Sequence, residues 1–289
     1  MTRTDERTVG ERGVSAGVAL GRSVGPHPAD EFLDRYWETA PLLVQRREPR
    51  RFEDLLSEAD VERIVCSGGL RYPAFRLVRA GERLETRDYT VDVPWRPTGF
   101  TRTADVDRVL AEFEAGATIV LQGLHLHWPP LATFCRDLEA VLGHPVQANA
   151  YYTPRGSQGL AVHHDTHDVF VLQTAGEKRW LVYEPVLELP LRDQRYSPDL
   201  GAPGEPVLDE TLSAGDTLYL PRGWLHEALT SETDSLHVTV GVNVVTALDA
   251  VRAALEECAG DVEFRRSVRA DGELAADLLD RLAGRLEPD

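Results

Sequence analysis

The sequence predicts a mainly β protein with flanking helices, built around a jelly-roll barrel of the double-stranded β-helix type. One observation is the run over residues 235–245, which alternates with period two and carries β-branched residues on both faces, as a buried strand does. The other is a pair of polar motifs, around His163 and His226, that lie far apart in the chain beside short apolar strands and glycine turns. Distant strands that meet at one mouth are typical of a jelly roll.

The remaining elements follow from composition and periodicity. Residues 1–28 are rich in Gly, Arg, Glu and Ser with little periodic apolar content, which predicts a mobile tail. We assign residues 29–247 to the barrel domain with its helical lead-in, and residues 248–289 to a C-terminal helical segment that Thr246 caps. Residues 185–206 are predicted to form a long loop near the barrel mouth, where substrate contacts concentrate. A helix or turn is expected to begin over 32–37, and further helices are expected over 52–57, 61–65, 106–113 and 131–142. Further strands are expected over 75–78, 89–91, 170–172 and 217–220.

The His-x-Asp triplet at residues 163–165 is the strongest chemical signal. If it lies on a strand, His163 and Asp165 project to one face and His164 to the other. With His226 they would place two imidazoles and one carboxylate on one side of an ion, which suits non-haem Fe(II). The open side then has room for an anionic bidentate cosubstrate and for O2. Taken alone, the triplet fits a strand-end polar cluster equally well, so the surrounding sequence decides.

A second histidine pair mimics the same spacing. His125 and His127 bracket a leucine, but no carboxylate accompanies them and a helical segment follows. We therefore interpret this pair as structural.

Beyond spacing, four segments resemble the JmjC-type ribosomal oxygenases, which are cupin-like 2-oxoglutarate- and Fe(II)-dependent hydroxylases. The resemblance implies that His163, Asp165 and His226 are the catalytic metal ligands, with Fe(II) as the metal and 2-oxoglutarate and O2 as cosubstrates. It implies a dioxygenase that hydroxylates an amino-acid side chain in a protein or peptide. The matching segments are 149–165, 168–180, 215–227 and 235–240, and a lead-in over 31–44 extends the resemblance to roughly residues 29–247.

Four further residues are expected to bind the cosubstrate. The resemblance implies that Lys178 holds the far carboxylate of 2-oxoglutarate, and a buried lysine does need an anion. The alternative is that Lys178 points to solvent. The resemblance also places cosubstrate contacts at Asn149 and Tyr151, which share one face of a strand with Thr153. Thr239 shares a face with His237 on the run over 235–245, and either of them could approach the cosubstrate, although threonine also favours strands for its β propensity.

Composition limits the class of protein. The 289 residues, 42% of them hydrophobic, can bury one sizeable core and a smaller appendage. No apolar run approaches the roughly 20 residues of a membrane span, so we expect no membrane insertion and a cytoplasmic enzyme. Three widely spaced cysteines suggest neither disulfides nor zinc. The net charge of -17 disfavours nucleic acid as a partner and would steer a basic peptide favourably, although it also serves solubility.

The sequence departs from the family in ways that leave the substrate open. Members that act on arginine tend to carry an acidic residue where this chain has Gly156, and members that act on histidine carry serine where it has Gly241. Larger members continue into a winged-helix domain, for which this sequence has no matching segment. The family also implies a homodimer through helices after the barrel. A hydroxylase of a free amino acid or natural-product intermediate, and a cupin-fold binding module without turnover, are the alternatives.

Overall fold

The computed structural model describes residues 17–67, 69–79, 82–92, 101–158, 160–230, 232–267 and 276–284. The chain divides into two compact units, Met1–Asn243 and Val244–Asp289, which are described separately.

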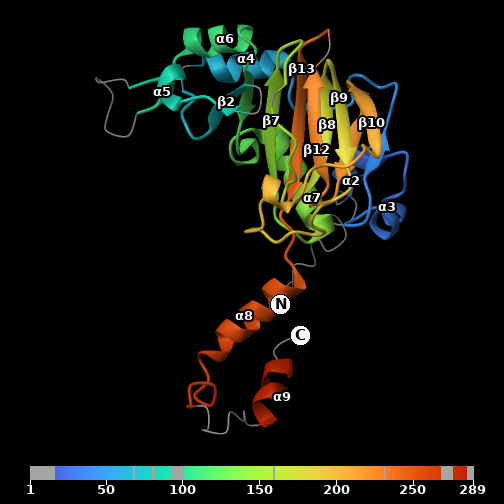
Figure 1. Cartoon of the computed structure of the whole chain (residues 1–289), viewed down its shortest axis with the longest axis vertical. Coiled ribbons are helices and arrows are strands. Elements are labelled where there is room, and N and C mark those ends of the chain that lie inside the picture. The colour runs from blue at the N-terminus through green and yellow to red at the C-terminus, as the bar shows by residue number, and fades with distance from the viewer. Residues whose placement is uncertain are drawn as a thin grey trace, which may run out of the picture. The chain divides into compact units, whose positions relative to one another are not determined.

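The first unit is built on an eight-stranded antiparallel sheet with strands in the order β1-β11-β8-β13-β7-β6-β2-β3 (Figure 1). Its centre is β13, which pairs along its whole length with β7 on one side and β8 on the other. The strands are β1 (Leu42–Val44), β2 (Phe75–Arg79), β3 (Glu82–Arg83), β6 (Thr118–Leu121), β7 (Val146–Thr153), β8 (Asp168–Ala175), β11 (Thr217–Leu220) and β13 (Ser235–Val242).

A smaller antiparallel sheet carries the order β10-β9-β12, made of β10 (Leu208–Ser213), β9 (Glu177–Tyr183) and β12 (Leu225–Thr230). An apolar cluster between the two sheets joins Val169 and Val171 of β8 to Trp180 and Val182 of β9. Because Phe170 and Leu172 of β8 enter the other core, this strand is buried on both faces, as its unbroken apolar sequence predicts. The mainly β jelly-roll fold with flanking helices is confirmed.

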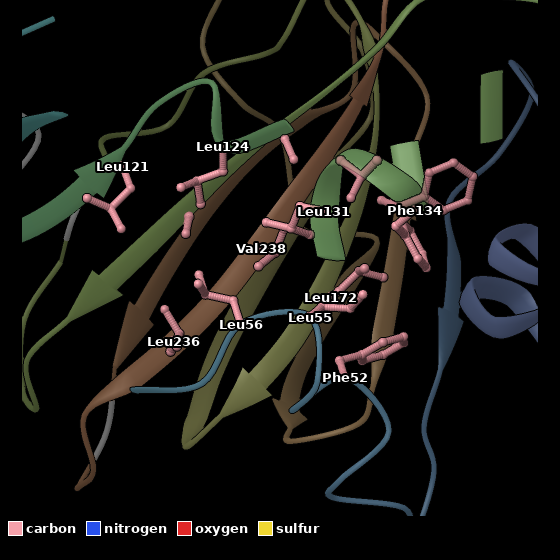
Figure 2. Close-up of a cluster of buried hydrophobic side chains, with 14 of the residues drawn as sticks. Phe52, Leu55, Leu56, Leu121, Leu124, Leu131, Phe134, Leu172, Leu236 and Val238 are labelled. Atoms are coloured by element: carbon pink, nitrogen blue, oxygen red, sulfur yellow. The ribbon is translucent and has the colours of Figure 1, made fainter. Parts of the chain in front are cut away.

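The opposite face of the large sheet is covered by helices and by the segment before α4 (Glu58–Cys66). Figure 2 shows Leu236 and Val238 of β13 beside Leu131 and Phe134 of α7 (Pro129–Leu142), together with Phe52 and Leu56. All of these side chains are at most 6% exposed. Truncation of one such leucine typically costs about 2–5 kcal/mol, so this core holds the sheet that carries the site.

Two sequence expectations are wrong in this part of the chain. The mobile tail was expected to reach residue 28, but α2 (Val18–Val24) is a helix whose Leu20 and Val24 are fully buried. This helix has only seven residues, too few for its apolar positions to show a helical period in the sequence. Residues 52–55 form turns and residues 56–57 have no regular structure, so the helix expected over 52–57 is absent. Residues 1–16 of the predicted tail lie outside the described residues.

The other predicted helices of this unit are present with shifted ends. Ser57 and Asp60 form a capping box at the start of α4, and Asp105 caps α6. Short elements complete the unit. The elements are α3 (Ala29–Arg35), α4 (Glu58–Cys66), α5 (Thr86–Tyr89), α6 (Val106–Glu114), the two-stranded sheet of β4 (Thr90–Val91) and β5 (Thr103–Ala104), and the 3-10 turns η1 (Leu124–Leu126) and η2 (Pro198–Leu200).

The second unit contains α8 (Ala247–Cys258) and α9 (Ala276–Gly284). Thr246 caps α8 through a capping box with Asp249, as the sequence predicts. Ala254 and Cys258 are buried, whereas Leu248 and Leu255 are 39% and 49% exposed. Among the described residues, no helix has the length and apolar character needed to cross a membrane.

Candidate metal and cosubstrate site

The three residues of the two polar motifs come together although 61 positions separate Asp165 from His226. One ligand atom from each of His163, Asp165 and His226 lies within 4.8 Å of the others. The His226 Nε2 atom is 3.9 Å from the Asp165 Oδ2 atom, and the two imidazole centroids are 4.5 Å apart. Two imidazoles and one carboxylate thus lie close enough together to share one ion.

The local backbone differs from the sequence expectation. His163 and Asp165 do not lie on a regular strand, because the segment before β8 has only isolated bridges, one of which pairs His163 with His226. The His163 N–H donates to the His226 carbonyl at 3.1 Å, and the His226 N–H donates to the His163 carbonyl at 2.8 Å. The two histidines are therefore held together by their own backbones.

The turn before β12 fixes the third residue of the group. The Gly223 N–H donates to the Asp165 carbonyl at 3.0 Å, which ties the turn to the carboxylate segment. Gly223 has φ +92, and a Cβ there would lie 2.5 Å from the Leu187 carbonyl oxygen. Only glycine fits this turn, which leads directly into His226.

Backbone carbonyls set the tautomer of both histidines. The Nδ1 atom of His226 is 3.0 Å from the Trp224 oxygen, and that of His163 is 2.7 Å from the Ala161 oxygen. A carbonyl oxygen can only accept, so each Nδ1 carries the hydrogen and each Nε2 keeps its lone pair. That arrangement prepares both imidazoles as metal ligands.

Electrostatics favour the protonation states that a cation needs. Burial, and then the neighbouring His163, lower the pKa of His226 to about 4, so this imidazole is neutral at neutral pH. Burial raises the pKa of Asp165, but the surrounding histidines, with His167 first, outweigh it and the pKa is lowered overall. The group offers two neutral imidazoles and one carboxylate.

Lys178 lies on β9 inside the same pocket, and the alternative that it points to solvent is wrong. It is 3% exposed, and its Nζ donates to the Thr153 hydroxyl at 2.9 Å. Burial lowers the pKa of Lys178 to about 7. Among the described residues no carboxylate pairs with it, so no counter-ion offsets the burial of this amine.

His237 and Trp180 complete the pocket, and of these two the sequence pointed only to His237 as a residue that could approach the cosubstrate. His237 stacks on Tyr151 at 5.0 Å and meets Trp180 edge-on at 5.4 Å. Among the described residues the Trp180 Nε1 and the His237 Nδ1 are buried without a hydrogen-bond partner. Burial, and then Lys178, hold the pKa of His237 well below its usual range. Trp180 could have been found from its spacing, since it is two positions after Lys178 on the same face of one strand.

The expected cosubstrate residues separate into two groups. Tyr151 and Thr239 line the pocket that holds the His163 group and Lys178. Asn149 does not line it, because its Oδ1 accepts the Gly123 N–H at 3.0 Å and its side chain lies in an adjoining hollow. Strand alternation places Asn149 and Tyr151 on one face but does not say which hollow each enters.

The other singled-out positions have local explanations. The His125 Nδ1 accepts the Ala148 N–H at 3.1 Å, which agrees with a structural role. A Cβ at Gly241 would lie 3.0 Å from the His167 Nε2, so that imidazole fills the space a larger residue would use. Gly156 has φ +67 and nothing within 4 Å of the position of a Cβ, so its turn conformation favours glycine.

Comparison with known proteins agrees with this geometry. A family model described as the JmjC domain matches residues 125–250. Ribosomal oxygenase 1 of Gallus gallus is 34% identical over 261 residues, which are 86% of this chain and 41% of that protein. The bifunctional lysine-specific demethylase and histidyl-hydroxylase NO66 of Drosophila melanogaster is 33% identical over 220 residues, 73% of this chain and 31% of that protein. The chain thus spans less than half the length of these two relatives.

Solved structures share the fold. The E. coli ribosomal oxygenase YcfD superposes with a TM-score of 0.56 and 18% identity over 90% of this chain and 66% of that chain. A structure of YcfD in complex with cobalt and 2-oxoglutarate superposes with a TM-score of 0.55 and 18% identity, over 89% of this chain and 65% of that one.

Proposed function

We propose that this chain, which belongs to the JmjC-domain family, is an Fe(II)- and 2-oxoglutarate-dependent dioxygenase that hydroxylates an amino-acid side chain in a protein or peptide. The observation that carries the proposal is the group formed by His163, Asp165 and His226 beside the buried Lys178. The names of the relatives and the cobalt and 2-oxoglutarate bound to YcfD support the same reaction.

The donor set fits ferrous iron. Both Nε2 lone pairs are available because both Nδ1 hydrogens are donated to backbone carbonyls, and Asp165 supplies one negative charge. In our proposal His163, Asp165 and His226 hold the metal and leave its other side open. Bound Fe(II), with 2-oxoglutarate and O2, supplies oxidative decarboxylation and the hydroxylation of a carbon.

The chain itself binds and orients the cosubstrate and the substrate, and it keeps water out of the site. We propose that Lys178 pairs with the distal carboxylate of 2-oxoglutarate, while Tyr151 and Thr239 line the same pocket. The ring nitrogens of Trp180 and His237 that have no partner among the described residues support a polar ligand in this space. Asn149 is then a candidate for contact with the substrate, since it lies in the adjoining hollow.

The partners and the compartment are proposals of the same kind. The net charge of -17 supports a polypeptide substrate over nucleic acid. Cys66, Cys135 and Cys258 are all free, which agrees with a reducing, cytoplasmic setting. The exposed Leu248 and Leu255 on α8 support a homodimer through the C-terminal helices.

The function is tested by succinate formation. We expect the purified chain to convert 2-oxoglutarate to succinate with added Fe(II), and a peptide pool to gain one oxygen by mass spectrometry. His163→Ala should lower Fe(II) affinity and turnover by at least about a hundredfold, because it removes a metal ligand. His125→Ala serves as the histidine control and should keep turnover. Fe(II) binding without any succinate in the wild type would favour the binding-module alternative.

A further inference from the structure

A second hollow adjoins the proposed metal site, and its charge is opposite to that of the whole chain. The chain has 48 acidic and 31 basic residues. The hollow nevertheless presents Arg76, Arg83 and Arg195, and none of the described residues that line it is Asp or Glu. Tyr151 lines both this hollow and the metal pocket, so the two spaces adjoin at its ring.

The register of the large sheet explains how Arg76 reaches this place. Arg76 pairs with Val120 of β6, and Val120 pairs with Tyr151 of β7, so the three residues form one row across the sheet. Two strand spacings separate the Arg76 and Tyr151 Cα atoms by about 10 Å, within the reach of an arginine side chain. Burial and the Asp165 carboxylate raise the pKa of Tyr151, and Arg76, which interacts with its hydroxyl, opposes them.

The same register brings a second arginine to this face. Arg83 of β3 pairs with Val78, which lies two positions after Arg76 on β2, so the two arginines belong to the same side of the sheet. The third arginine, Arg195, comes from the long loop over residues 185–206, which the sequence places near the mouth. The neighbouring strands β2 and β3 and a loop distant in the chain therefore supply the positive charge.

These arginines differ from others in the chain by their partners. Arg79, on the same strand as Arg76, pairs with Glu112, and Arg222 pairs with Glu38 and Asp168. In the hollow, by contrast, Arg76, Arg83 and Arg195 form no ion pair with any Asp or Glu of the described residues. The Arg76 Nε is buried without a hydrogen-bond partner among them, as are the Nε atoms of Arg79 and Arg222.

The Arg83 guanidinium lies 5.1 Å from the Tyr72 ring centroid, a contact with an aromatic face that leaves its charge unneutralised. Guanidinium groups held this way are ready to form forked hydrogen bonds with an oxyanion.

We propose that this hollow binds an anionic side chain of the substrate, so that the enzyme acts on an acidic or phosphorylated polypeptide segment. The inference rests on the proposed function, because it takes the hollow as the substrate side of the metal group. It also reverses the expectation that the net charge selects a basic peptide. At physiological ionic strength the Debye length is about 8 Å, so distant acidic residues are screened while contacts inside the hollow are not.

Direct binding tests the inference without turnover. The Mn(II)-loaded full chain is titrated, with fluorescence anisotropy as the readout, into labelled hexaglutamate, a phosphoserine peptide and an oligothymidine. We expect the first two to bind and their relative affinity to tell carboxylate from phosphate. The double variant Arg83→Gln/Arg195→Gln should weaken hexaglutamate binding about tenfold, the combined effect of two partly exposed charge contacts.

A matched double variant controls for the loss of two positive charges. Arg87 lies on α5 close to β3 and Arg192 lies on the same loop as Arg195, but neither lines the hollow. Arg87→Gln/Arg192→Gln should bind hexaglutamate as the wild type does. No binding of either anionic peptide, equal losses in the two double variants, or a preference for oligothymidine would each overturn the inference.

Succinate formation separates this inference from the proposed function. It is measured without peptide in the wild type and in Arg87→Gln/Arg192→Gln. If succinate forms but anion binding does not depend on Arg83 and Arg195, the inference is overturned and the proposed function stands. Arginine-dependent binding of hexaglutamate without any succinate would instead contradict the proposed function and leave the anion site standing.

Discussion

Lys178 carries a buried amine, and its protonation can be followed through the affinity for 2-oxoglutarate. Burial lowers its pKa to about 7, and only the charged form attracts a carboxylate. We therefore expect 2-oxoglutarate to bind best below pH 7, with the apparent Kd rising about tenfold per pH unit above it. Calorimetric titration of the Mn(II)-loaded protein between pH 6 and pH 9 measures this. His226 does not interfere, because its pKa is about 4.

Two variants identify the titrating group. Lys178→Arg keeps its charge across this range, so its Kd should vary little with pH. Lys178→Met should bind 2-oxoglutarate weakly throughout, because the distal carboxylate has lost its partner. If Lys178→Met kept the wild-type slope, the pH dependence would belong to another group and the assignment of Lys178 would be wrong.

At the scale of the element, the turn before β12 connects stability with the metal group. Gly223 has φ +92, and a Cβ there would lie 2.5 Å from the Leu187 oxygen. Gly223→Ala should therefore destabilise the fold by about 1–3 kcal/mol and weaken Fe(II) binding, because the turn also holds Asp165 and leads into His226. Urea unfolding and metal titration measure the two effects.

The control comes from the loop on the other side of β10. Gly204 has no atom within 4 Å of the position of a Cβ and its φ lies outside the left-handed region. Gly204→Ala should change stability by less than about 0.5 kcal/mol. Intact Fe(II) affinity in Gly223→Ala would show that the turn does not position His226.

Elements with strong periodicity or flanking turns could be predicted from sequence. The apolar run between two turns gave the limits of β11, and the capping residue Thr246 gave the start of α8. The segment around His163 could not be predicted as it is, because only isolated bridges hold it. Alternation selects a strand face, yet whether Asn149 enters the metal pocket or the hollow beside it depends on packing between sheets.

The site residues show the same division between pattern and packing. His163, Asp165, His226 and Lys178 could be selected from motif spacing and family resemblance. His237 could be expected near the cosubstrate from the face it shares with Thr239, but its stacking on Tyr151 could not be predicted, because it depends on the pairing of β13 with β7. The arginine hollow could not be predicted from the sequence either, because its residues come from β2, β3 and a distant loop.

At the scale of the whole molecule, the proposed dimer can be tested on α8. Leu248 and Leu255 are seven positions apart, so they lie on one stripe of the helix, and both are exposed in the single chain. Burial of such a stripe against a second copy removes apolar surface from water at roughly 25 cal/mol per Å². We expect light scattering after size-exclusion chromatography to give twice the 32.1 kDa chain mass.

A change of charge on that stripe should separate the copies. Leu248→Glu/Leu255→Glu would bury two unpaired carboxylates in the interface, and we expect a monomer with its barrel intact by circular dichroism. Ala253 is exposed on the opposite side of α8, so Ala253→Glu is the control and should remain dimeric. A wild type that is monomeric at tens of micromolar, or a Leu248→Glu/Leu255→Glu variant that stays dimeric, would remove α8 as the interface. Because His163, Asp165, His226 and Lys178 all come from the first unit, the monomeric variant should still convert 2-oxoglutarate to succinate.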